Sequence, residues 1–247
     1  MITIKEIANV TMTEEKKKSA KNDFFAYYVG RPISYLLTIP FLYTRISPNT
    51  ITFISIIFVV LGFAFSLIKN PIFVLISWVS FFMWNLFDGI DGNIARYKKN
   101  YSKNGSLFDA TSGYLSMFFT FLSIGVIAYN FPGWISEKLN IDPVLYVVAG
   151  SISGFAIILP RLLMHKKKSS SVGLDKTKEL QDKSSYNWKK ILVLNLTSIA
   201  GFIQVFILLL SIVFVFFGLS LFDIFTIGYL ILNLLFMIIT TYKLIKE

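Results

Sequence analysis

Residues 71–95 read PIFVLISWVSFFMWNLFDGIDGNIA, a run that stays almost wholly apolar until Asp88 and Asp91. About 20 apolar residues in a helix span the ~30 Å hydrocarbon core of a bilayer. The stretch therefore predicts a transmembrane helix with two carboxylates near its end. Ionisable groups within such a helix are costly and mark candidate functional sites.

The rest of the chain repeats this apolar pattern. Of its 247 residues 55% are hydrophobic and 15% are charged, whereas a soluble domain needs more polar surface. Five further runs are predicted to span the membrane, at 48–68, 106–129, 143–164, 191–217 and 220–242. We therefore predict an all-α polytopic membrane protein, with six transmembrane helices in a domain over residues 46–247.

Two segments precede the first span. Residues 1–21 are polar and predict a cytoplasmic N-terminus. Residues 22–45 mix aromatic and apolar side chains with two arginines and two prolines. This composition favours a juxtamembrane helix in the cytoplasmic interface, with its aromatic rings at headgroup level. An irregular linker is the alternative.

The basic residues fix an orientation. With six spans, 22 of the 24 Lys and Arg residues fall on the side that holds both termini, and only Lys69 and Lys138 fall on the other. The positive-inside rule places the basic side in the cytoplasm, and we expect a plasma membrane of bacterial type. Because the basic residues lie in short loops between apolar runs, no nucleic-acid partner is expected. The absence of cysteine excludes disulfides and thiolate sites.

Three carboxylates are predicted to converge at the cytoplasmic end of a helical hairpin. Asp88 and Asp91 share a helix face because they are three residues apart, and Asp109 lies near the start of the next span. Three carboxylates in a low dielectric repel one another unless a cation joins them. Oxygen ligands favour Mg²⁺ or Mn²⁺. The alternative is simple ion pairing with Arg96 and the loop lysines.

Small residues surround these carboxylates. Gly89, Gly92 and Gly105 remove side chains beside them, which would let a ligand or a facing helix approach. Ala95 continues the slim face, and Arg96 offers a guanidinium suited to phosphate. Ion pairing alone does not explain glycines at these positions.

Residues 88–96 read DGIDGNIAR, and residues 105–109 read GSLFD. This pattern resembles the D-x-x-D-G-x-x-A-R, G-x-x-x-D-x-x-x-D signature of the CDP-alcohol phosphotransferase (phosphatidyltransferase) family. Every fixed position matches except the last. Arg31-Pro32 and the stretch SPNTIT at 47–52 also look like the family's usual start.

The resemblance implies a membrane transferase of phospholipid biosynthesis. Such enzymes use a divalent metal to hold a CDP-linked donor, such as CDP-diacylglycerol or a CDP-alcohol, and an alcohol or alcohol-phosphate acceptor displaces CMP. The family also implies membrane-lipid substrates and a homodimer. By this resemblance the metal ligands are Asp88, Asp91 and Asp109, the catalytic residues are Asp109 and Arg96, and the nucleotide or phosphate site comprises Gly92, Ala95, Arg96, Gly105, Asn49 and Thr52.

The last aspartate of the pattern is replaced by Gly113. In the family that aspartate acts as general base and helps to bind a second metal, and glycine can do neither. Losing a general base typically costs ~10²–10⁴-fold in rate. Three accounts stay open: the acceptor is activated by its own ionised group or by metal alone, another residue takes over, or the protein binds a CDP-linked ligand without turnover.

Span four suggests two further features. Arg161 follows Pro160 and is a candidate for holding an anionic acceptor, whereas the nearby lysines are more simply topological anchors. Gly150 and Gly154 are four apart, a spacing consistent with a dimer face. A small transporter is a third functional hypothesis, but transporters usually place their charges at mid-membrane within internal repeats, and no repeat is visible here.

Overall fold

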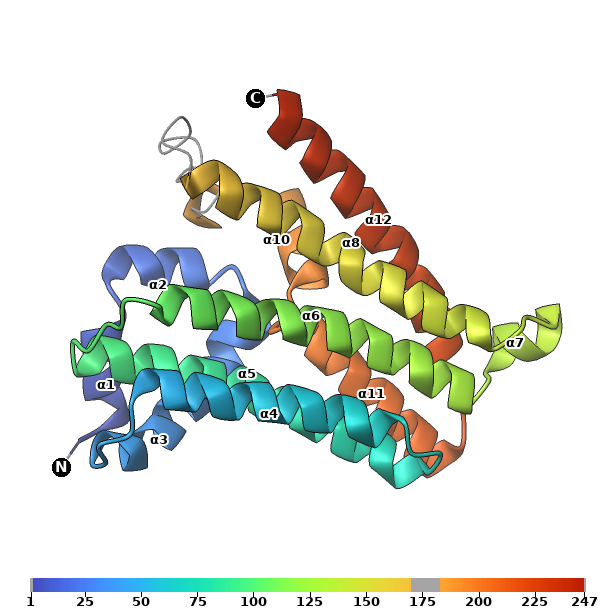
Figure 1. Cartoon of the computed structure of the whole chain (residues 1–247), viewed down its shortest axis with the longest axis horizontal. Coiled ribbons are helices and arrows are strands. Elements are labelled where there is room, and N and C mark those ends of the chain that lie inside the picture. Colours follow the sequence, from blue (N-terminus) through green and yellow to red (C-terminus); the bar gives the residue numbers. More distant parts are fainter. Residues whose placement is uncertain (1, 170–182, 247) are drawn as a thin grey trace. The chain divides into compact units, whose positions relative to one another are not determined.

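The computed structural model describes residues 2–169 and 183–246, and within these ranges it is all-helical, without strands (Figure 1). The predicted fold class is therefore confirmed. The helices are α1 (Ile4–Thr11), α2 (Glu14–Ala20), η1 (Ala26–Gly30), α3 (Arg31–Leu42), α4 (Pro48–Ser66), α5 (Pro71–Tyr97), α6 (Gly105–Asn130), α7 (Trp134–Leu139), α8 (Val144–Ser169), η3 (Lys183–Ser185), α10 (Trp188–Thr197), α11 (Phe202–Phe217) and α12 (Phe222–Lys246).

The chain divides into two compact units. The first unit comprises Met1–Val59, Ser80–Ser116 and Asp182–Val205, and the second comprises Val60–Val79, Met117–Gln181 and Phe206–Glu247. The candidate site lies wholly in the first unit, because its residues come from the ends of α4, α5 and α6 that belong there.

Five helices of the described residues are long and apolar enough to cross a membrane, namely α4, α5, α6, α8 and α12. The pair α10 and α11 makes a sixth span if it is counted as one, but the two helices are bent by 52° at their junction. The span predicted over 191–217 is therefore built from two helices with a bend between them. Within a membrane span, non-helical backbone is tolerated where protein buries it, and Ser198 and Ile199 at the break are 8% and 3% exposed.

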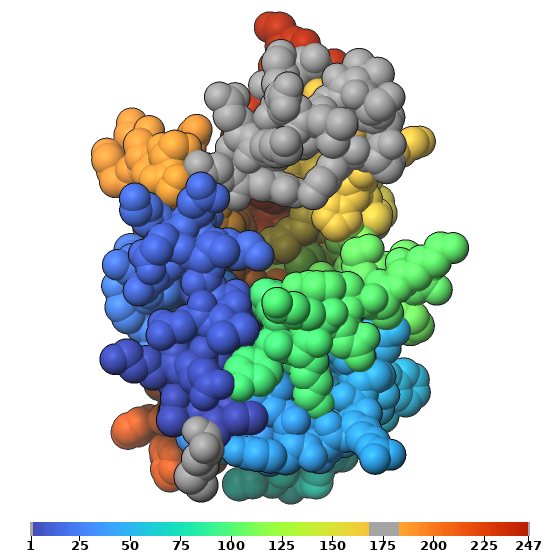
Figure 2. Space-filling view, turned by 90° about the vertical axis from the view of Figure 1, so that its left-hand side faces the viewer, coloured from blue at the N-terminus to red at the C-terminus, as the bar shows by residue number. Residues whose placement is uncertain are grey.

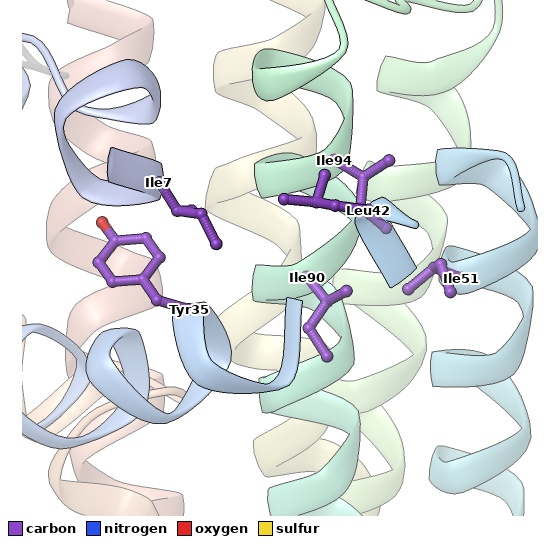
Figure 3. Close-up of a cluster of buried hydrophobic side chains, with 6 residues drawn as sticks. All are labelled: Ile7, Tyr35, Leu42, Ile51, Ile90 and Ile94. Atoms are coloured by element: carbon purple, nitrogen blue, oxygen red, sulfur yellow. The ribbon is translucent and has the colours of Figure 1, made fainter. Parts of the chain in front are cut away.

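A hydrophobic cluster joins the helices of the first unit (Figure 3). Burial of each large apolar side chain contributes roughly 1.5–3 kcal/mol, so the cluster fixes α1 and α3 against the helix that carries Asp88 and Asp91. Its members are Ile7 from α1, Tyr35 and Leu42 from α3, Ile51 from α4, and Ile90 and Ile94 from α5.

The N-terminal segment holds two capped helices, which the sequence reasoning missed. Thr3 accepts a hydrogen bond from the backbone N–H of Glu6, and Thr13 accepts one from that of Lys16. Thr3 and Glu6 have the spacing of a capping box, so a signal was available. Figure 2 shows this segment, in dark blue, on the surface beside the green connection between α5 and α6. The Tyr97 hydroxyl donates to the Glu6 carboxylate there.

Most of residues 22–45 are helical, through η1 and α3. Asn195 of α10 anchors the start of this segment: its Oδ1 accepts from the backbone N–H of Phe24 at 2.9 Å, and its Nδ2 donates to the carbonyl of Asn22 at 2.7 Å. Ser198 Oγ donates to Asp23 Oδ2 at 3.0 Å. The location of the segment at the membrane interface stays a prediction.

In the second unit, glycines bring α6 and α8 into close contact. A Cβ atom on Gly150 would lie 2.4 Å from the carbonyl oxygen of Phe121, and one on Gly154 would lie 3.0 Å from that of Phe118. The hypothesis that Gly150 and Gly154 form a dimer face was therefore wrong, because α6 of the same chain covers them. The predicted homodimer now depends on the family resemblance alone.

Candidate active site

A Schellman motif ends α5 directly after the predicted site residues Ala95 and Arg96. The N–H of Asn100 donates to the carbonyl of Ala95 at 3.0 Å, and that of Lys99 donates to the carbonyl of Arg96 at 3.4 Å. Lys99 has φ 51°, the left-handed conformation that this motif requires and that glycine usually supplies. Ala95 and Arg96 are thereby held in the final helical turn.

The three predicted carboxylates come together. One oxygen each of Asp88, Asp91 and Asp109 lies within 4.8 Å of the others. Asp91 is 6% exposed, Asp88 is half-buried and Asp109 is exposed. Ligand oxygens of one octahedral ion lie roughly 3–4 Å apart, given metal–oxygen distances of ~2.1 Å, so a small side-chain adjustment suffices. This carboxylate cluster, defined by Asp88, Asp91 and Asp109, fits a hard divalent cation.

A buried polar network behind the carboxylate cluster ties α4, α5 and α6 together. Thr52 Oγ1 donates to Asp91 Oδ2 at 2.5 Å. One turn further along α4, Ser55 Oγ lies 2.9 Å from Ser112 Oγ, and Trp84 Nε1 donates to the same Ser112 oxygen at 2.9 Å. The network orients Asp91 and fixes the register of α6, which positions Asp109. The sequence reasoning missed this network, because isolated polar residues in apolar runs do not indicate which residues of other helices they contact. The residues missed are Ser55, Trp84 and Ser112.

Gly92 provides room for Arg96 within its own helix. A Cβ atom on Gly92 would lie 2.8 Å from Arg96 Nη2 and 3.1 Å from Nη1, so the guanidinium folds back over the glycine. Asn93 then holds it, accepting from Arg96 Nη2 at 3.4 Å. Asn93 is 2% exposed and donates to Thr38 Oγ1 at 3.1 Å. The prediction that Gly92 leaves space for a nucleotide is not tested, but the structure gives the residue this other role.

The other predicted glycines serve close packing. A Cβ atom on Gly89 would lie 3.0 Å from Cβ and Oγ of Ser34, so α3 approaches α5 there. One on Gly105 would lie 3.0 Å from Ser102 Oγ, which itself donates to Asn49 Oδ1 at 3.0 Å. Asn49 thus anchors the connection between α5 and α6.

Gly113 differs from these glycines, because a Cβ atom there would meet nothing within 4 Å. It lies one helical turn after Asp109 on α6, so both positions share a helix face. A side chain at 113 would therefore begin in open space, and close packing does not explain the glycine.

Arg161 lies on α8 in the second unit. Its predicted role in holding an acceptor stays a prediction.

The fold and the site define an integral membrane protein with a carboxylate-based candidate metal site. The profile of the family described as CDP-alcohol phosphatidyltransferase matches residues 45–242. The chain therefore belongs to the CDP-alcohol phosphatidyltransferase family, a family of transferases, and the resemblance found in residues 88–109 is confirmed. A comparison with curated proteins gives no match. The consequence of Gly113 stays a prediction.

Proposed function

We propose that this protein transfers a phosphatidyl or substituted phosphate group from a CDP-linked donor to an alcohol and releases CMP. The observation that carries the proposal is the carboxylate cluster, whose oxygens lie within 4.8 Å of one another on adjacent helices. Family membership supplies the reaction class. Phosphoryl transfer asks a protein mainly to position groups and neutralise charge, and these side chains are suited to both tasks.

The proposed reaction is a displacement at phosphorus. The acceptor hydroxyl oxygen bonds to the phosphorus of the transferred group, the bond from that phosphorus to the CMP oxygen breaks, and CMP leaves with the electron pair. A bound Mg²⁺ or Mn²⁺ would stabilise charge on the diphosphate and the leaving group. Asp88, Asp91 and Asp109 would hold that ion.

The chain's own residues position the reactants. Thr52 donates to Asp91 Oδ2 and so fixes the carboxylate's orientation. Arg96, held by Asn93, presents a positive charge to the diphosphate. Because Gly113 has no side chain to accept the hydroxyl proton, we propose that the proton passes to an ionised group carried by the acceptor itself. Ser112 is a poor substitute, since it is fully buried between Ser55 and Trp84.

We propose further that the reaction serves phospholipid synthesis at the cytoplasmic face of a bacterial-type plasma membrane, in a homodimer. The charge asymmetry of the loops, with 22 of 24 basic residues on one side, supports the orientation. The homodimer is taken from the family alone. Arg161 is proposed as an acceptor contact.

A second candidate is a relative that binds a CDP-linked ligand without turnover. Gly113 favours it, because the position has room for the usual aspartate and yet lacks one. Both candidates predict metal-dependent CDP binding, and only the first predicts CMP release.

The test is CMP release by purified protein in nanodiscs that contain CDP-diacylglycerol and a panel of alcohols and alcohol phosphates, with and without Mn²⁺. We expect metal-dependent release that Asp91→Ala abolishes. The second variant is Gly113→Asp, which restores the last aspartate of the family pattern at a position where a Cβ atom meets nothing within 4 Å. Release by Gly113→Asp alone would overturn the transferase proposal in favour of the non-catalytic relative.

A further inference from the structure

Arg31, the first residue of α3, is a half-buried cation with a weak partner. Its Nη1 donates to the thioether sulfur of Met12 at 3.7 Å. Sulfur is a poor acceptor for a charged donor. Among residues 2–169 and 183–246, no carboxylate oxygen lies within ion-pair distance of Arg31. A partly desolvated guanidinium without an anion is costly, so the position suggests a binding role.

Arg96 is also short of partners. Its Nε is buried, and in the described part of the chain it meets no hydrogen-bond acceptor. Its Nη2 has only the 3.4 Å hydrogen bond to Asn93. A guanidinium has five N–H donors in a fork that matches phosphate oxygens, and most of that capacity is available here.

A chain of hydrogen bonds links the backbone of Arg31 to the side chain of Arg96. The Ser34 hydroxyl donates to the carbonyl of Arg31 at 2.9 Å, and Asn93 Nδ2 lies 3.4 Å from that hydroxyl while Asn93 Oδ1 accepts from Arg96. A Cβ atom on Gly89 would lie 3.0 Å from Ser34 Oγ, so the segments of α3 and α5 that carry the two arginines are packed against each other. Like charges held close by packing are stabilised when an anion lies between them.

We propose that Arg31 and Arg96 together bind one phosphoryl group of a substrate, which makes Arg31 a phosphate-binding residue of this protein. This inference rests on the proposed function, because the bound phosphoryl group would belong to the donor or the acceptor of that reaction. The shared chemistry is a phosphate dianion or a diphosphate, and its source is either the CDP-linked donor or a phosphorylated acceptor. When the anion binds, it would replace the Met12 sulfur as the hydrogen-bond acceptor of Arg31 Nη1.

The experiment measures binding rather than turnover. Full-length protein in phosphatidylcholine nanodiscs is titrated with CDP, with sn-glycerol 3-phosphate and with inorganic phosphate, each with and without Mn²⁺. The variants are Arg31→Gln, Arg31→Lys and the control Arg45→Gln, which removes an exposed arginine. Loss of a charge-assisted bidentate contact weakens anion binding by about tenfold or more. Cytidine and glycerol serve as probes without phosphate.

We expect Arg31→Gln to weaken the binding of at least one phosphate-containing probe about tenfold. Arg31→Lys should restore part of that affinity. Arg45→Gln should bind every probe as the unaltered protein does, and the affinities for cytidine and glycerol should not change in any variant. A weaker affinity for CDP assigns the anion to the donor diphosphate, and a weaker affinity for glycerol 3-phosphate assigns it to the acceptor.

If Asp91→Ala abolishes metal-dependent CDP binding while Arg31→Gln leaves the affinity for every probe unchanged, the inference is overturned and the proposed function stands. If the unaltered protein binds phosphate through Arg31 but binds no CDP, the proposed function fails and the anion site survives. Binding of none of the probes overturns both.

Discussion

Two buried aspartates, one in each unit, have opposite surroundings. Asp223 of α12 is fully buried, and its Oδ2 accepts from the backbone N–H groups of Ile135 and Ser136 at 2.8 and 3.1 Å, which caps α7. Its Oδ1 accepts from the N–H of Ile224 at 2.8 Å. Asp91 is almost as buried, but its side-chain donor is Thr52 and its neighbours are two further carboxylates.

The difference shows how to read a buried acid. Where backbone N–H groups surround a carboxylate, the group stabilises the fold. Where carboxylates gather close to one another, their mutual repulsion costs stability, and the arrangement is retained for a ligand. Asp223 is thus a structural residue, and the carboxylate cluster is the functional candidate.

The largest effect is expected for Asp91→Ala. Removing a ligand that fixes the metal costs several kcal/mol of transition-state stabilisation, so CMP release should fall at least ~10³-fold at 1.36 kcal/mol per tenfold. The melting temperature without metal should stay the same or rise, because repulsion within the carboxylate cluster is relieved. The rate of CMP release and the melting temperature are both measured in nanodiscs. Retained activity would remove Asp91 from the site.

Asp223→Ala should show the reverse. It leaves the buried N–H groups of Ile135 and Ser136 without an acceptor, and each such group costs about 1–3 kcal/mol. We expect the free energy of unfolding in mixed detergent and SDS to fall by about 2–4 kcal/mol. Metal-dependent CDP binding by the folded fraction should be unchanged, and Asp223→Asn should lose less. A loss of CDP binding without a loss of stability would contradict the structural role.

Thr52→Val tests a smaller part of the contrast. The variant keeps the shape of the side chain and removes the hydrogen bond to Asp91. Loss of a residue that orients a metal ligand typically costs 10–100-fold in metal affinity, which a Mn²⁺ titration followed by electron paramagnetic resonance would measure. Thr226→Val is the control, because that buried hydroxyl donates to the carbonyl of Phe222 in its own helix. Equal affinities in both variants would show that Asp91 needs no orienting partner.

The smallest effect is expected at Gly113. Because a Cβ atom there meets nothing within 4 Å, Gly113→Ala should raise the free energy of unfolding by up to ~1 kcal/mol through helix propensity. Gly150→Ala is the matched contrast, since its Cβ atom would lie 2.4 Å from the carbonyl oxygen of Phe121, and we expect a loss of about 1–3 kcal/mol. Unfolding titrations compare the two. Destabilisation at Gly113 would point to a neighbour that occupies this space.

Sequence reasoning reached much of the fold. Long apolar runs predict spans because hydrophobic length is a local property, and the five long helices fall where those runs lie. The break at 198–201 was missed, since it depends on Asn195 and Ser198 meeting partners more than 170 residues away. The N-terminal helices were missed because the prediction was based on the polar composition of the segment, although the Thr3–Glu6 spacing signals a helix cap.

For the site, the sequence by itself determined which carboxylates meet, because Asp88 and Asp91 are fixed by helical spacing and Asp109 follows across a short turn. It also determined the family. Only the tertiary structure decided what each small residue does: Gly92 makes room for Arg96, Gly89 for Ser34 and Gly150 for α6, while Gly113 faces open space. It likewise linked the backbone of Arg31 to the side chain of Arg96 through Ser34 and Asn93. The physical reason is that covalent spacing sets neighbours along a helix, whereas side chains from separate helices become neighbours only when those helices pack.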